Sequence, residues 1–161
     1  MVCTNILTFF YLNGRGDELS ETLNWVFDML KHRAYLDGTY YYAGADTFLF
    51  FLSRFLRVAK SSPSTSVFNR FAPIFSERVH ERMGASGDAL ALSMRILAAS
   101  VVEVCDRVDY EALLDMQEGD GGFPAGWMYK YGMSGMLLGN RGFTTALAVK
   151  AVKEIEKFHH T

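Results

Sequence analysis

The sequence predicts an all-α protein in which helical hairpins stack on one another. Apolar residues recur at helical spacing in about seven segments. Glycine-rich turns separate these segments, and no two segments show the alternating pattern of paired strands. The chain has 161 residues, of which 50% are hydrophobic and 14% aromatic. This is enough for one compact core, so we expect a single helical-repeat domain over residues 1–161.

The N-terminal third is expected to hold three helices. The first covers residues 2–12, and Asp17 is expected to cap a second helix that ends near His32. Residues 35–42 contain a run of tyrosines that has no partner strand of matching pattern, so they are interpreted as an ordered loop. The third helix covers residues 45–59. Its inward face is expected to hold Phe48, Phe51, Leu52, Phe55 and Leu56.

The middle third is expected to hold two further helices. Residues 61–64 form a Ser- and Pro-rich linker, which is followed by a helix over 65–83. Pro73 lies inside this helix and should kink or split it, because proline lacks the backbone donor that the helix needs. Asp88 is expected to cap the next helix, which covers residues 88–104 and is apolar on nearly every face, as in a buried helix.

The C-terminal third is expected to hold two helices joined by a long loop. Asp109 begins a short helix, and the glycine-rich residues 118–142 are expected to form an ordered, shaped loop. Asn140 caps the last helix. The buried face of that helix is expected to hold Leu147, Ala148, Ala151, Val152 and Ile155. The pair His159–His160 is interpreted as a frayed tail and not as a metal site.

Composition excludes several classes of function. The net charge is −2, and no basic patch is present, so nucleic acid is not the expected partner. Cys3 and Cys105 suggest no disulfide framework, which favours a reducing compartment. No apolar run is long enough to span a membrane, and the start lacks the basic region of a signal peptide. We therefore expect a cytoplasmic protein with no cofactor and no metal.

An internal repeat relates the two halves of the chain. Asp37-Gly38 and Asp120-Gly121 are each followed by aromatic residues and then by a helix. In both places the Asp-Gly pair predicts a tight turn, because glycine adopts positive φ without strain. Gln117 is expected to bond backbone groups of the following repeat. The interpretation is that such a turn fixes one hairpin against its neighbour.

The second copy of this repeat carries a resemblance to a known family. The segment Leu113-Leu114-x-Met116-Gln117-x-x-Asp120-Gly121-Gly122-Phe123 resembles the QW repeat of terpenoid cyclases and protein prenyltransferases, with Phe123 where tryptophan is usual. Residues 32–39 and 139–150 resemble uncharacterised toroid proteins found mostly in fungi. Some of their relatives are joined to haloacid-dehalogenase-like domains and make drimane-type sesquiterpenes. The resemblance implies an α/α-toroid, of which this chain supplies roughly half.

The sequence departs from that family in its chemistry. The resemblance implies a protonating Asp-x-Asp-Asp motif or a metal-binding Asp-Asp-x-x-Asp motif, and neither occurs here. The zinc ligands of prenyltransferases have no match either. Asp120 could be a catalytic acid, but its place in the repeat favours a structural role in the turn, and the same holds for Asp37. The catalytic residues therefore stay unassigned.

Two groups of residues are candidates for binding a substrate. The tyrosines and tryptophan at Tyr41, Tyr42, Trp127 and Tyr129 could form an aromatic wall, since aromatic faces attract a carbocation. Ordinary packing at helix ends is the alternative for them. Arg141, at the start of the last helix, could bind a diphosphate. Its alternative is a surface cation beside a helix cap.

Two functions follow from these observations. The first is a terpenoid-cyclase-related domain that binds an isoprenoid diphosphate in an aromatic cavity. The second is a non-catalytic helical-repeat module for a protein or a hydrophobic ligand, or a degenerate cyclase fragment. A half toroid would leave apolar faces uncovered, so a missing toroid half or a homo-oligomer is the expected protein partner.

Overall fold

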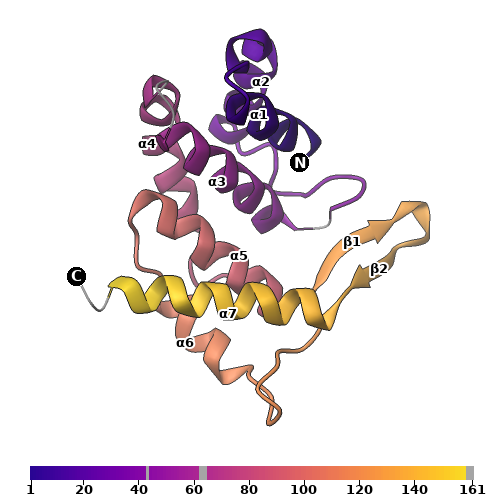
Figure 1. The fold of residues 1–161 in the computed structure, drawn as a ribbon. Helices are drawn as coiled ribbons and strands as arrows, with labels where there is room; N and C mark the ends of the chain where they lie inside the picture. The colour runs from indigo at the N-terminus through magenta and orange to yellow at the C-terminus, as the bar shows by residue number, and fades with distance from the viewer. Residues whose placement is uncertain (43, 62–64, 159–161) are drawn as a thin grey trace.

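The computed structural model describes residues 1–42, 44–61 and 65–158, and within them the chain forms seven α-helices (Figure 1). The helices are α1 (Val2–Leu12), α2 (Ser20–Lys31), α3 (Ala45–Ser61), α4 (Thr65–Arg82), α5 (Ala89–Ala99), α6 (Arg107–Asp115) and α7 (Arg141–Phe158). Short 3-10 helices cover Gly16–Leu19, Ser100–Val102 and Gly132–Ser134. The all-α fold class is confirmed. Most of the linker at 61–64, and the pair His159–His160, lie outside the described residues.

The segment at 118–142 differs from the expected loop, because it contains a β-hairpin. Strand β1 (Trp127–Tyr131) pairs with strand β2 (Met136–Gly139) in an antiparallel sheet. The sequence pattern does not predict the hairpin, because nearly all the side chains on both of its faces are exposed. Among the residues of the two strands, only Met128 is buried. Strand prediction depends on an alternation of buried and exposed positions, which this hairpin lacks.

Three helix boundaries also differ from the expected ones. Asp17 lies inside the Gly16–Leu19 turn and caps nothing, and α2 begins three residues later. Asp106, not Asp109, caps α6 by accepting a hydrogen bond from the Asp109 backbone N–H. The helix expected to reach residue 104 ends at Ala99, where the chain tightens into 3-10 geometry. Helix ends are set by which side chain reaches a free backbone group, and several aspartates compete for that role here.

Two predicted caps are present, and α4 is not split at Pro73. The Asp88 carboxylate accepts from the Ala91 backbone N–H at 2.9 Å, and the Asn140 side chain accepts from the Phe143 backbone N–H at 2.8 Å. Helix α4 continues through Pro73 without being split. Phe71 and Phe75, one on either side of it, are completely buried, and their packing holds the helix together.

The odd-numbered helices form a row, and α5 lies at its centre. Helix α3 packs against α1 and α5, and α5 packs in turn against α7. Among the even-numbered helices, α4 packs against α3, α2 against α4, and α6 against both α5 and α7. One buried cluster surrounds α3 and α4, and a second surrounds α5 and α7. This row positions the site, because α3 and α7 lie on opposite sides of α5 (Figure 1).

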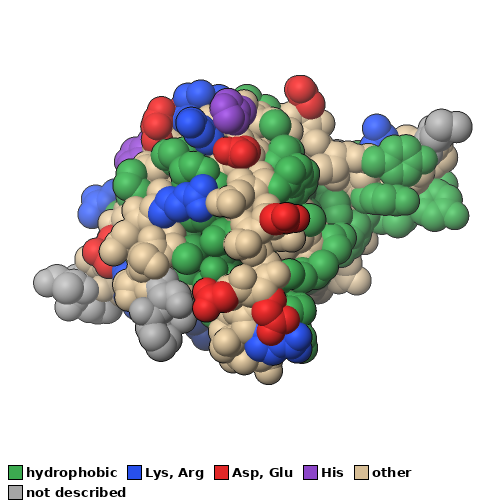
Figure 2. Space-filling view, turned by 90° about the horizontal axis from the view of Figure 1, so that it is seen from above, with side chains coloured by type: hydrophobic (Ala, Val, Ile, Leu, Met, Phe, Trp, Pro, Cys, Tyr) green, Lys and Arg blue, Asp and Glu red, His purple; other side chains and the backbone are tan. Residues whose placement is uncertain are grey.

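The hairpin projects from one end of the row (Figure 1). Its surface carries a gathering of hydrophobic side chains, visible as the protrusion in Figure 2. The exposed members are Trp127, Tyr129, Tyr131, Met136, Leu137 and Leu138. Across the described residues, none of the helices combines the length and the apolar character needed to cross a membrane.

Candidate functional site

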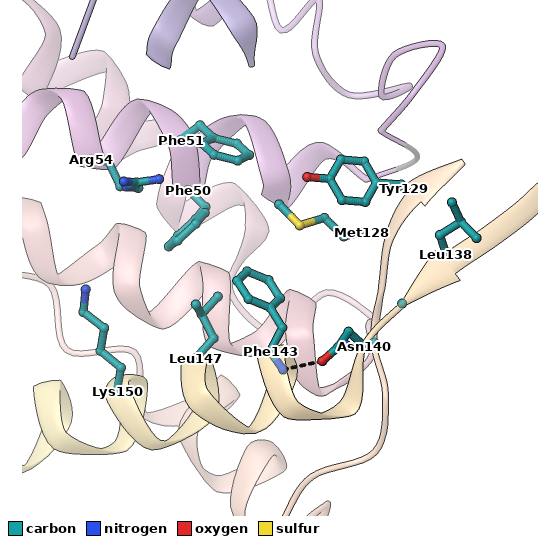
Figure 3. A pocket seen from close by; sticks show the side chains of 12 residues that line it. Phe50, Phe51, Arg54, Met128, Tyr129, Leu138, Asn140, Phe143, Leu147 and Lys150 are labelled. Atoms are coloured by element: carbon teal, nitrogen blue, oxygen red, sulfur yellow. Dashed lines mark hydrogen bonds between the residues drawn. The ribbon is translucent and has the colours of Figure 1, made fainter. Parts of the chain in front are cut away.

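A cavity of about 520 Å³ opens between α3, α7 and the hairpin (Figure 3). Helix α3 contributes Phe50 and Phe51, and helix α7 contributes Phe143 and Leu147. Helix α3 can offer two phenylalanines because nearly every residue of its first half is buried, so its side chains are shared between the core and the cavity. A volume of this size suits a small molecule, and the lining is mostly apolar.

The hairpin closes one end of the cavity. Met128, Tyr129 and Leu138 line this end, together with Gly126 and Gly139. The two glycines are required by close approach, because a Cβ on Gly139 would collide with the Gly126 carbonyl oxygen and one on Gly126 would collide with Leu90. The backbone can therefore form this end wall only with glycine at both places.

Hydrogen bonds to both neighbouring helices hold the base of the hairpin. The Trp127 backbone N–H donates to the Asp88 carboxylate at 2.8 Å, and the Gly126 N–H donates to the Thr144 hydroxyl at 2.9 Å. Further along, the Lys130 backbone N–H donates to the Tyr41 carbonyl oxygen at 2.8 Å. The wall is thus fixed to α5, to α7 and to the loop before α3.

The opposite end of the cavity is cationic. Arg54 of α3 and Lys150 of α7 lie there, away from the hairpin (Figure 3). No carboxylate within the described residues lies at ion-pair distance from either side chain, and the Arg54 guanidinium lies 5.9 Å from the centre of the Phe51 ring. Both cations also line an adjoining cavity, which Arg57 and residues of α1 complete. Two charges without an internal partner beside an apolar cavity suit a ligand with an anionic head and an apolar tail.

The predicted aromatic residues lie around this cavity in different ways. Tyr129 lines it, and the Tyr42 ring packs on Tyr129 with centroids 5.1 Å apart. Burial, and next to it the neighbouring Tyr129, raise the pKa of the Tyr42 hydroxyl. Trp127 lines a smaller polar cavity beside Arg82 instead, and the exposed Tyr41 contacts Tyr40 edge to face. The two tyrosine-bearing segments of the internal repeat therefore meet at the hairpin.

Arg141 lies outside the cavity and joins the repeat motif to α7. Its guanidinium contacts the Glu118 carboxylate at 2.6 Å and the Asp120 carboxylate at 2.7 Å. Asp120 also accepts from the Gly122 N–H, and that bond, followed by Arg141, holds the pKa of its carboxyl below the usual range. Both contacts bind the Asp120 side chain locally, to its own turn and to α7. Its carboxylate acts with Arg141 as a link between the turn and the last helix.

The remaining motif residues complete this turn. Gln117 donates to the Gly121 carbonyl oxygen at 3.0 Å, so it stays within its own turn and does not reach the next repeat as expected. Gly121 has a φ of +83°, which explains glycine there. Phe123 is buried, and its backbone N–H donates to the Thr145 hydroxyl. The turn is therefore self-contained, and Arg141 and Thr145 connect it to α7.

Sequence reasoning missed most of the cavity lining. Phe50 lies outside the face of α3 that was predicted to point inward. A large apolar side chain at such a position is the sequence feature that could have indicated the cavity. Arg54 and Lys150 carried no signal, because isolated cations on helices are usually solvated. The lining contains no carboxyl group. In the described part of the chain, no three His, Cys, Asp or Glu side chains gather as a metal site would require.

Comparison with known proteins gives one relative. The chain is 47% identical over 152 residues to a drimenol cyclase of Aspergillus calidoustus. The aligned part covers 94% of this chain but 28% of the relative, so the chain spans little more than a quarter of that protein's length. No protein-family profile matches the chain, and no solved structure matches it.

Proposed function

The chain is homologous to part of a terpenoid cyclase, and on this premise we propose that it is a cyclase-related domain that binds an isoprenoid diphosphate. The carrying observation is the cavity with one aromatic, apolar end and one cationic end (Figure 3). The apolar chain of the ligand lies along Phe50, Phe51 and Phe143. Its diphosphate lies at Arg54 and Lys150.

Each part of this arrangement has a physical reason. Arginine presents a planar fork of donors that matches phosphate oxygens, and lysine adds a point charge. The aromatic faces attract positive charge that develops on a polyene, by about 0.5–2 kcal/mol per ring. The lining that the structure describes holds aromatic, aliphatic and cationic side chains, so the role proposed for this cavity is to bind and fold the isoprenoid.

Removing both cations tests this proposal. The double variant Arg54→Gln with Lys150→Gln is expected to bind farnesyl diphosphate about 10- to 100-fold more weakly, because each loses a hydrogen bond to a charged group. Affinities for farnesyl and geranylgeranyl diphosphate are measured by titration calorimetry. Lys153→Gln is the matched control, since Lys153 lies on the same helix and does not line the cavity.

Two results would decide against this site. If the unaltered chain binds neither diphosphate, the proposed function is wrong. If Arg141→Gln weakens binding and the double variant does not, the diphosphate lies at the start of α7. We expect Arg141→Gln to leave affinity unchanged, because Glu118 and Asp120 already neutralise that guanidinium.

A second candidate function is docking through α1, and one observation favours it. Val2, Ile6, Phe9 and Leu12 form a stripe along one face of α1, and Val2, Phe9 and Leu12 are each more than 60% exposed. Such a stripe normally packs against another helix. We propose that a second copy of the chain covers it.

Sedimentation analysis tests the docking proposal. The unaltered chain is expected to sediment as a dimer, and the variant Ile6→Lys with Phe9→Lys as a monomer. Both residues are exposed, so the charges should leave the fold intact, which circular dichroism checks. A monomeric parent chain that binds no apolar dye would exclude this function.

A further inference from the structure

The two ends of the cavity are fixed relative to each other. Arg54 and Lys150 extend from α3 and α7 at one end, and Leu138 of β2 lies at the other (Figure 3). Both helices pack against α5. The base of the hairpin is hydrogen-bonded to Asp88 and Thr144. A ligand held by its anionic head therefore meets the hairpin at a set distance along its tail.

The hairpin presents three side chains to that tail, those of Met128, Tyr129 and Leu138. Gly126 and Gly139 contribute only backbone, and Met128 is buried against the second core cluster. Leu138 is half exposed and lines the hairpin end of the cavity from β2 (Figure 3). The next residue, Leu137, has the same exposed fraction of 43% but does not line the cavity, since neighbouring side chains in a strand point to opposite faces.

We propose that the β1–β2 hairpin sets the length of the isoprenoid chain that the cavity accepts, with Leu138 as the determining side chain. This inference rests on the proposed function, because it takes the diphosphate to be held at Arg54 and Lys150. A chain one isoprene unit too long must then displace the Leu138 side chain or pull its head from the cations. Both are unfavourable, since overpacking and an unpaired charge each cost binding energy.

The surroundings of Leu138 explain why its removal would admit a longer chain. Met136 lies two residues before Leu138 on β2, on the same face of the strand, and it is 60% exposed, so apolar surface continues along the hairpin beyond Leu138. A tail that passes the shortened side chain would meet apolar surface before it meets bulk water. Met128 and Tyr129 would keep the rest of the end wall in place.

The experiment compares the ratio of affinities for geranylgeranyl and farnesyl diphosphate in matched variants. Leu138→Ala is expected to raise this ratio by about tenfold or more in favour of the longer chain, as expected for removing a steric block in an apolar pocket. Leu137→Ala is the control and should leave the ratio unchanged. Leu138→Trp changes the wall in the opposite sense and should shift preference toward geranyl diphosphate.

The outcomes separate this inference from the function on which it rests. If the unaltered chain binds none of the diphosphates, both the proposed function and the length-setting role are wrong. Normal binding of farnesyl diphosphate with the same ratio in the parent, Leu138→Ala and Leu138→Trp overturns the length-setting role alone. An equal shift in Leu137→Ala also overturns it, because the effect would then come from general weakening of the hairpin. Thermal unfolding of each variant verifies that the fold is retained.

Discussion

Replacing Arg95 with methionine is expected to lower the free energy of unfolding by about 3–5 kcal/mol, because it leaves the buried Asp109 carboxylate without its cation. Arg95 is 2% exposed and lies in the middle of α5. Its guanidinium donates to both oxygens of Asp109, at 2.7 and 2.9 Å, and to Asp46 at 3.2 Å. A fourth bond reaches the Ala85 carbonyl oxygen at 2.6 Å.

This ion network connects four of the helices. Asp46 lies in the first turn of α3 and is also bound by Arg82 of α4, while Asp109 lies in α6. Methionine fills a similar volume but donates nothing, so Asp109 would lose its guanidinium partner and Asp46 would keep only Arg82. Because a domain of this size is stable by about 5–15 kcal/mol, the loss is a large fraction of the total.

Urea unfolding followed by circular dichroism measures the effect of Arg95→Met. Arg15→Met is the control, since the ion pair of Arg15 with Glu18 is exposed to solvent and exposed pairs contribute little. Its midpoint should match that of the parent chain. An equally small change for Arg95→Met would mean that packing alone, without the buried ion pairs, holds α3, α5 and α6 together.

The second large effect is a loss of stability as the pH rises, caused by Asp106. This side chain is fully buried, and within the described residues its Oδ2 atom has no hydrogen-bond partner. Burial first, and then the neighbouring Asp109 carboxylate, raise the pKa of Asp106 from 3.8 to about 7. Arg95 is already paired with Asp109. An ionised Asp106 would therefore add a second buried negative charge without a cation of its own.

The direction follows from proton binding. Between pH 4 and pH 7 the folded chain keeps a proton on Asp106 that the unfolded chain has released. The stability from this group is therefore fully present below pH 4 and is lost as the pH rises through about 7. From pH 5 to pH 8 the loss amounts to about 3 kcal/mol.

Asp106→Asn should remove this pH dependence. Asparagine keeps the oxygen that caps α6 but carries no charge, so the variant should be more stable than the parent chain at pH 8. Urea unfolding at pH 5 and pH 8 gives the comparison, and the difference between the two proteins cancels the other titrating groups. Asp106→Ala, which also loses the cap, should be less stable than Asp106→Asn at both pH values. Parallel pH profiles for the parent and Asp106→Asn would contradict the assignment of a neutral Asp106.

The relation to terpenoid cyclases was predictable from one short segment, and the reason is local. The turn at Gln117, Asp120 and Gly121 is closed by hydrogen bonds between residues a few positions apart. The motif can therefore be recognised from the spacing of these residues in the sequence. The same holds for the caps at Asp88 and Asn140, where the partners are three residues apart. Interactions between residues so close in the sequence require particular residue types at a fixed spacing, which the sequence alone reveals.

The candidate site could not be read in this way. Arg54 and Lys150 come from helices far apart in the chain, and neither residue type nor spacing marks them. Arg141 seemed the better diphosphate ligand from its place at a helix start, but only the folded chain shows two carboxylates already bound to it. Charge compensation depends on distances in space, which local patterns do not contain.

The sequence by itself determined the helical fold class, the turn motif and the caps at Asp88 and Asn140, because each depends on apolar periodicity or on partners a few residues apart. The tertiary structure decided the rest. It placed α3 and α7 on either side of α5. It also brought Tyr42 and Tyr129 together at a hairpin whose strands show no alternation of buried and exposed positions. It also left Arg54 and Lys150 as charges beside an apolar cavity. Those relations arise only when the helices pack, since packing sets which distant side chains meet and which remain without a partner.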